Sequence, residues 1–154
     1  MKFTKLLCAS HGSTGAKAAE NLALELCKGG GELHHLFVVP DFWRGMRGDD
    51  WLNNAATQDR YGKYVERQLA TEADEVIKHL KQACQKADIK YTHDVQVGKP
   101  ADCLLKASQT REFDLIVIGS PRPKNAAGLR SKINLTRLLP MLKVPIIIAP
   151  YPGV

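Results

Sequence analysis

Apolar residues of this chain fall into two alternating kinds of segment. Segments about the length of a β-strand occupy residues 3–10, 32–39, 89–97, 114–118 and 144–148; the last two are nearly continuous apolar runs, and 89–97 is the least regular. Between them, apolar residues recur at every third or fourth position, as on one face of a helix, over residues 14–28, 58–87 and 100–109. Apolar strands separated by helices are typical of a parallel sheet covered on both faces. The 154 residues therefore predict one doubly wound α/β domain spanning 1–154.

The first predicted helix has a narrow apolar face built from small side chains. Ala16, Ala19 and Ala23 lie on this face, and their size allows the helix to approach a sheet closely. Ser13 or Thr14 is suited to cap the start of the helix by accepting backbone N–H bonds.

Residues 41–57 lack any hydrophobic period and predict an extended loop before the longest helix. This segment is longer than the usual connection, and it holds both tryptophans of the chain, Trp43 and Trp51. Two interpretations remain open. Either the aromatic side chains cover a ligand crevice or form a partner surface, since exposed aromatics favour interfaces, or they provide the ordinary packing of an inserted loop.

Composition and charge narrow the class of protein. The 22 basic and 16 acidic residues give a formal net charge of +6, which favours anionic partners in a non-specific way. No apolar run approaches the roughly 20 residues that span a bilayer, and the amino-terminal segment lacks a secretory signal pattern. The four cysteines, which are far apart and have no CxxC spacing, fit buried reduced thiols. We therefore expect a cytoplasmic protein with no membrane association.

The carboxyl ends of the predicted strands are the expected place for a ligand. In doubly wound folds, ligands bind beyond these ends, where the strand order reverses. The ends that matter here are His11-Gly12-Ser13, Val39-Pro40 and Gly119-Ser120. A candidate site is therefore expected at these three turns.

Of the residues at these turns, His11 is the one that could serve in the most chemical roles. A histidine there either contacts a ligand, as a donor to phosphate or a pH-sensitive group, or is purely structural. No second metal ligand lies at a suitable spacing, and His34 and His35 should point to opposite faces of their strand. We expect no metal site. No nucleophile with a partnered base is evident either, because helix capping explains Ser13, so we do not expect catalysis.

Several short motifs together identify a family. They are the Gly12-Ser13 turn, the strand end LFVVP at 36–40, Gly98-x-Pro100 before a helix, DLIVIG at 114–119, and Val144-Pro145 before the last strand. With these motifs the chain resembles the universal stress protein domain over essentially its full length. The resemblance implies a five-stranded parallel sheet in the order 3-2-1-4-5 with helices on both faces. It also implies a homodimer formed through the last strand, Val144 to Ala149.

The phosphate-binding motif of that family is largely replaced in this chain. Many members bind ATP through G-x2-G-x9-G-[S/T] after the fourth strand. This chain keeps Gly119 but carries Arg122, Lys132 and Ile133 at the other three positions. Glycine lets backbone N–H groups approach phosphate without a Cβ in the way. His11 also stands where an aspartate usually precedes the first turn, so the resemblance implies a nucleotide-site scaffold with a degenerate loop.

The segment 120–137 retains a strong positive charge. Its five cations are Arg122, Lys124, Arg130, Lys132 and Arg137. One interpretation is a side-chain anion clamp that replaces the backbone cradle, since arginine and lysine bind phosphate. The other is a solvated loop, in which Ser120 and Ser131 serve as turn or helix caps.

These features lead us to expect a stress-response protein that acts as a dimeric, non-catalytic binding or regulatory module. Any ligand would be an adenine nucleotide or another small anion, with adenine against the backbone around Val38 and Val39. The candidate ligand-binding residues are His11, Gly12, Ser13, Val38, Val39, Gly119, Ser120, Arg122 and Lys132.

Two alternatives remain open. The first is an ATP-binding universal stress protein, with slow hydrolysis, that uses Arg122 and Lys132 in place of the cradle glycines. The second is a nucleic-acid accessory protein recruited by the basic loop, which would bind with a steep salt dependence. No stacking motif in the sequence supports nucleic-acid binding.

Overall fold

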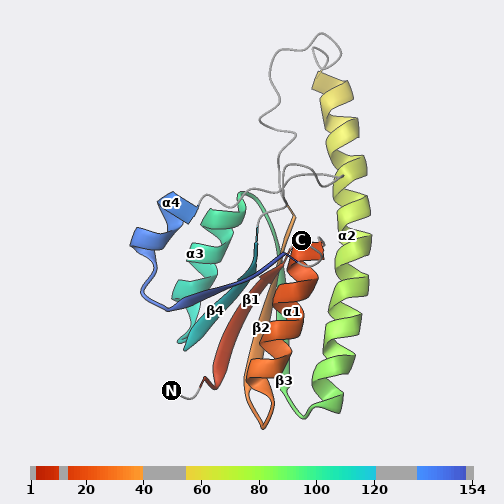
Figure 1. Ribbon diagram of the computed structural model, residues 1–154. Coiled ribbons are helices and arrows are strands. Elements are labelled where there is room, and N and C mark those ends of the chain that lie inside the picture. The colour runs from red at the N-terminus through yellow and green to blue at the C-terminus, as the bar shows by residue number, and fades with distance from the viewer. Residues whose placement is uncertain (1–2, 11–13, 40–54, 121–134, 152–154) are drawn as a thin grey trace.

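The computed structural model describes residues 3–10, 14–39, 55–120 and 135–151 (Figure 1). The strands are β1 (Lys5–Ser10), β2 (Glu32–Val39), β3 (Lys90–Val97), β4 (Leu115–Gly119) and β5 (Ile146–Ala149). The helices are α1 (Thr14–Cys27), α2 (Ala55–Lys86), α3 (Pro100–Thr110), the short α4 (Leu135–Leu138) and the 3-10 turn η3 (Leu139–Met141). Strands and helices thus alternate as the hydrophobic pattern predicts.

The five strands form one parallel sheet in the order β3-β2-β1-β4-β5. This confirms the predicted order 3-2-1-4-5 and the doubly wound class. Figure 1 shows α1 and α2 on one face of the sheet, with α3 and α4 on the other. Strand β1 lies at the centre, between β2 and β4. Strands β2 and β3 follow it toward one edge of the sheet and β4 and β5 toward the other, so the strand order reverses between β1 and β4.

The central strand supplies side chains to both faces, because successive residues of a strand point in opposite directions. Leu6 and Cys8 pack in the core beneath α1 and α2, whereas Leu7 and Ala9 pack beneath α3 and α4. All four are buried. A strand that is apolar on both faces is stable only when helices cover both faces.

Helix α1 approaches the sheet through the small side chains predicted from the sequence. Ala16, Ala19 and Ala23 are at most 1% exposed. The helix packs over β1 and β4, and the absence of bulk on this face lets its backbone come close to the central strands.

Helix α2 is longer than the strands it covers. Its 32 residues extend roughly 48 Å at 1.5 Å per residue, whereas the eight residues of β2 extend roughly 26 Å. Figure 1 shows its amino-terminal part continuing beyond the carboxyl ends of the strands.

Two sequence predictions need correction. The helix begins at Ala55, so residues 55–57 belong to α2 and not to the predicted loop 41–57; alanine has the highest helix propensity of any residue. The rest of that loop, with Trp43 and Trp51, lies outside the described residues. All four cysteines are free, as expected, but Cys103 is only partly buried.

Asp114 ties the amino ends of the two central strands together. Its carboxylate Oδ2 accepts hydrogen bonds from the Thr4 backbone N–H at 3.0 Å, the Thr4 hydroxyl at 2.8 Å and the Lys5 backbone N–H at 3.0 Å. These bonds from Thr4 and Lys5 hold the pKa of the Asp114 carboxyl below its ordinary value. An aspartate before β4 therefore aligns that strand with β1.

Candidate functional site

The carboxyl ends of the central strands lie together, as a strand-end site requires. The β1–β4 pairing runs up to Ala9 opposite Ile118. The next residues, Ser10 and Gly119, are the last of their strands. The switch in strand order between β1 and β4 therefore opens beside Gly119, where this class of fold places its ligands.

Four of the predicted site residues lie in the described part of the chain. Val38 is 2% exposed and packs in the core beneath α3, which leaves only its backbone for an adenine contact. Val39 ends β2 and pairs with Val97. Gly119 pairs with Ala149 on β5, and the Ser120 N–H donates to the Ala149 carbonyl at 2.9 Å.

The other five predicted site residues, His11, Gly12, Ser13, Arg122 and Lys132, lie outside the described residues. The structure therefore places the adenine-side and strand-end residues of the predicted site. The contribution of the basic segment, residues 120–137, stays a prediction.

Directly beneath the end of β1 lies a group of polar side chains that we call the polar cluster: the buried Ser10, Glu20 and His35, and the partly buried Tyr91. The Ser10 Oγ atom lies 2.6 Å from His35 Nε2, and His35 Nδ1 lies 2.9 Å from the Tyr91 hydroxyl. Ser10 is 1% exposed and His35 is 0% exposed. Three consecutive strands of the sheet, β1, β2 and β3, are thus joined by one chain of hydrogen bonds.

Glu20 completes the polar cluster from helix α1. Its Oε1 atom lies 3.8 Å from His35 Nε2, which is too long for a hydrogen bond, and it has no other hydrogen-bond partner. The nearby Ser10 hydroxyl favours the ionised form of the Glu20 carboxyl group and so lowers its pKa. Glu20 is 5% exposed, so a carboxyl group lies buried beside the Ser10–His35 pair.

Burial shifts the pKa values of the acid and the imidazole in opposite directions. Desolvation raises the pKa of Glu20 from 4.5 to about 7, opposed by the Ser10 hydroxyl and the charge of Lys17. Desolvation, with the nearby histidines, lowers the pKa of His35 from 6.5 to about 4. Burial also raises the pKa of the Tyr91 phenol above its ordinary value. At neutral pH His35 is therefore uncharged, while Glu20 is near the midpoint of its titration.

The sequence interpretation missed the polar cluster, although two signals were present. Glu20 follows Ala16 by four positions and precedes Ala23 by three, so an acid lies on the face of α1 that packs against the sheet. His35 lies between Leu33 and Phe37 on one face of an otherwise apolar strand. A charged group on a core-facing stripe is rarely buried without a partner.

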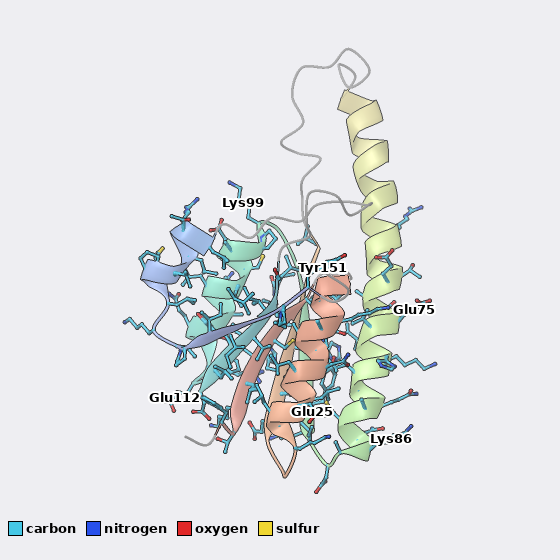
Figure 2. The ribbon with its side chains drawn as sticks, viewed as in Figure 1. Glu25, Glu75, Lys86, Lys99, Glu112 and Tyr151 are labelled. Carbon is cyan, nitrogen blue, oxygen red and sulfur yellow. The ribbon has the colours of Figure 1, made fainter. Side chains whose placement is uncertain are left out.

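A second concave region lies at the opposite end of the sheet. A cavity of about 240 Å³ is lined by Lys5, Leu6, Glu32, His34, Thr92, Arg111, Glu112 and Phe113. In this cavity, His34 Nδ1 lies 2.7 Å from the Thr92 hydroxyl, whereas the His35 ring bonds Tyr91 on the other face of the sheet. The two histidines therefore face opposite sides, as predicted. Figure 2 shows Lys99 at one end of α3 and Glu112 beyond its other end. The cavity contains none of the predicted site residues, and its two acids balance its lysine and arginine.

Metal binding and membrane insertion find no support in the described residues. No group of three or more His, Cys, Asp or Glu side chains within these ranges is arranged to hold a metal ion. Within the same ranges, no helix has the length and apolar character needed to cross a membrane.

The parallel sheet, its strand order and its strand-end site define a doubly wound α/β protein of the kind that binds ligands at the switch point. The sequence profile of the universal stress protein family matches residues 2–150. The chain therefore belongs to the universal stress protein family. No curated protein sequence matches the chain.

Solved structures of distant relatives share the whole fold. A universal stress protein family member from Burkholderia pseudomallei is 18% identical with a TM-score of 0.64, covering 96% of each chain. The universal stress protein UspA from Lactobacillus plantarum is 19% identical with a TM-score of 0.62, covering 97% of this chain and 99% of its own. A family member from Arabidopsis thaliana, solved with AMP bound, is 13% identical with a TM-score of 0.61, covering 97% of this chain and 93% of its own.

Proposed function

We propose that this chain is a cytoplasmic stress-response protein that acts as a dimeric, non-catalytic binding or regulatory module. Its ligand is an adenine nucleotide or another small anion, held weakly at the strand-end site. The observation that carries this proposal is the mismatch at that site. The family scaffold is present up to Gly119, but Arg122, Lys132 and Ile133 replace the rest of the phosphate motif.

Two further observations support the nucleotide class. The related structure from Arabidopsis thaliana holds AMP, and this chain presents the backbone of Val38 and Val39 at the end of β2, the position that we assign to adenine. In place of backbone N–H groups, the cations of the basic segment bind the phosphate, because arginine and lysine make charge-assisted hydrogen bonds to it.

Replacing both Arg122 and Lys132 by alanine is expected to weaken the binding of AMP and of ATP with Mg²⁺. Loss of two charge-assisted hydrogen bonds lowers affinity by about tenfold or more. Isothermal titration calorimetry on the wild type and the double variant measures this change. A matched control, Lys78→Ala with Lys86→Ala on the exposed face of α2, should leave the affinity unchanged.

The outcomes of this titration separate the candidate functions. Weak binding that the Arg122 and Lys132 substitutions abolish supports the proposal. Micromolar ATP binding that they abolish, with slow release of phosphate, indicates the competent nucleotide binder instead. Binding that they leave intact contradicts the role of the basic segment. A steep loss of oligonucleotide affinity with salt would favour the nucleic-acid alternative.

The proposed dimer uses the edge strand β5. Ile148 on this strand is 40% exposed, and Leu139 and Met141 of the preceding turn η3 are 45% and 54% exposed. An apolar edge strand with unpaired backbone groups is suited to pair with a second copy.

Replacing Ile148 by lysine is expected to convert the dimer to a monomer, because a charge on an edge strand opposes pairing. Sedimentation equilibrium or light scattering after gel filtration reads the mass directly. The control is Val95→Lys on β3, at the other edge of the sheet, where Val95 is 41% exposed. A monomeric wild type, or a dimer lost only in the Val95 variant, contradicts the assignment of β5.

A further inference from the structure

We propose that the cavity of about 240 Å³ at the amino ends of the strands, which we call the amino-end cavity, is a second binding site, for a free α-amino acid with an apolar side chain. The Arg111 guanidinium and the Lys5 ammonium hold the carboxylate of this ligand, and the Glu112 carboxylate holds its ammonium. The proposal goes beyond the proposed function, because the amino-end cavity lies at the opposite end of the sheet from the strand-end site and shares no residue with it.

Backbone hydrogen bonds hold the walls of the amino-end cavity in place. The Lys5 N–H donates to the Asp114 carboxylate at 3.0 Å, and the Asp114 N–H donates to the Lys5 carbonyl at 2.8 Å. The start of β1 is thereby tied to residues 111–113, which lead into β4. Lys5 also pairs with Glu32 at the start of β2. A ligand therefore meets side chains whose backbone is already ordered, which limits the entropic cost of binding.

The amino-end cavity lies where helix α3 stops covering the sheet. Along β2, alternate residues share a face, and Leu36 packs beneath α3. His34 and Glu32 lie farther toward the start of the same strand, and both line the cavity. Helix α3 ends at Thr110, directly before the lining residue Arg111. The last carbonyl groups of a helix carry a partial negative charge, which favours a cationic group in the ligand.

One wall of the amino-end cavity is apolar and aromatic. Leu6, Phe113 and the ring of His34 form it, and the two rings are stacked with their centroids 6.0 Å apart. Burial, together with the charge of Arg111, lowers the pKa of His34 from 6.5, so this ring is uncharged at neutral pH. The wall therefore suits an aliphatic or aromatic side chain of the ligand.

Polar contacts orient the Arg111 guanidinium within the cavity. Its Nη1–H donates to the Thr92 hydroxyl in a long hydrogen bond of 3.4 Å, and the same hydroxyl lies 2.7 Å from His34 Nδ1. These contacts occupy only one of the guanidinium N–H donors. The planar arrangement of the remaining donors matches the two oxygens of a carboxylate.

Three charged side chains of the cavity have no ion-pair partner among the described residues: Lys5, Arg111 and Glu112. Glu32, the other charged residue of the lining, lies 3.6 Å from Lys90 and is already paired. A ligand carboxylate between Lys5 and Arg111 interacts with both cations, and a ligand ammonium interacts with Glu112. One zwitterion therefore supplies a partner to every unpaired charge of the cavity.

The volume and the charge of the cavity argue against a nucleotide at this position. A cavity of about 240 Å³ has room for roughly eight water molecules, and it is smaller than the roughly 300–1,000 Å³ of sites for drug-sized ligands. The lining carries two cations and two carboxylates. A phosphate dianion would meet Glu32 and Glu112 with no positive charge of its own, whereas a zwitterion matches a lining whose charges balance.

The test is titration of the ¹⁵N-labelled full chain with L-leucine, followed by nuclear magnetic resonance. Two analogues are matched probes: isocaproate is leucine without its ammonium group, and isoamylamine is leucine without its carboxylate. L-Leucine at up to about 10 mM should shift the amide signals of His34, Thr92 and Phe113. Each analogue should bind about fivefold or more weakly, because each lacks one charge-assisted contact.

Substitutions of Arg111 and Glu112 assign the two ends of the ligand. Both residues are exposed, so Arg111→Gln and Glu112→Gln should leave the core intact. Each should weaken L-leucine by about fivefold or more. Glu112→Gln should leave the affinity for isocaproate unchanged, and Arg111→Gln should leave the affinity for isoamylamine unchanged, because in each case the analogue lacks the group that the residue binds.

Glu25→Gln is the matched control, because Glu25 is an exposed acid that bonds Lys28, and Figure 2 shows Glu25 on the outer side of α1, far from Glu112 beyond the end of α3. This variant should bind L-leucine as the wild type does. The absence of shifts at these amide signals overturns the proposal. Isocaproate that binds as tightly as L-leucine also overturns it, as does inorganic phosphate or AMP that shifts the same signals at a lower concentration.

Discussion

Replacing Glu20 by glutamine is expected to stabilise the protein by roughly 3 kcal/mol above pH 7 and to leave its stability nearly unchanged near pH 4.5. The pKa of Glu20 is raised from 4.5 in the unfolded chain to about 7 in the folded protein. A raised pKa means that the folded state favours the protonated acid. Its stabilising contribution is complete below the unfolded pKa and is lost as the pH rises through the folded pKa. Glutamine has nearly the shape of the acid and carries no charge to desolvate.

The pH profile of the wild type has a second slope from His35. Its pKa is lowered from 6.5 to about 4, so the folded state disfavours the charged ring. Stability from this group is complete above the unfolded pKa and is lost as the pH falls through the folded pKa. The contributions of Glu20 and His35 oppose one another between pH 4.5 and 6.5. Stability is therefore expected to be greatest in this interval and to fall on either side of it.

Urea denaturation at a series of pH values measures both slopes. In Glu20→Gln the fall above pH 6.5 should disappear, and the rise from pH 4 to 6.5 caused by His35, which Glu20 offsets in the wild type, should become visible. The exposed control Glu25→Gln should reproduce the wild-type profile to within about 0.5 kcal/mol. Parallel profiles for the wild type and Glu20→Gln would show that Glu20 does not carry the predicted proton.

Replacing Phe37 by alanine is expected to lower the free energy of unfolding by about 3–5 kcal/mol. Phe37 is 0% exposed and packs against Ala73 and Ile77 of α2. Its ring also meets His35 edge-on, with centroids 6.3 Å apart. The substitution therefore leaves a cavity where α2 rests on the sheet, and the surrounding backbone can close it only in part.

Chemical denaturation monitored by circular dichroism checks this value. Val95→Ala on β3 is the matched control, because Val95 is 41% exposed and its truncation should cost about 0.5 kcal/mol or less. A loss of about 1 kcal/mol or less for Phe37→Ala would contradict the tight contact between α2 and β2.

The sequence predicts the fold well because period and length distinguish its elements. The run from Leu115 to Ile118 is apolar at every position, which is typical of a strand covered on both faces, and Ile116 and Val117 are indeed buried on opposite faces. The start of α2 was placed three residues late, because residues 55–57 carry no apolar period. Element ends are set by local backbone bonding as much as by burial.

The site was predicted less completely, for a physical reason. Strand ends can be located from the turns that follow them, so Gly119 and Val39 lie where expected. The core-facing positions of Glu20 and His35 could be read from the sequence, but their partners could not, because the polar cluster joins residues of four elements through contacts across the sheet. Ser10 and Tyr91 are far apart in the sequence, and a buried hydrogen bond between strands has no signature in the residues near either partner.

Because α2 is long, a small tilt at its contact with the sheet would move its amino-terminal end much farther. Its buried described side chains lie from Ala73 onward, whereas its first residue, Ala55, lies 18 residues earlier, or about 27 Å along the axis. A tilt of about 5° at the contact with Phe37 would therefore displace the far end by about 2 Å. Small changes of packing beneath the helix would thus be magnified beyond the carboxyl ends of the strands, at the end of the sheet where we propose the ligand site.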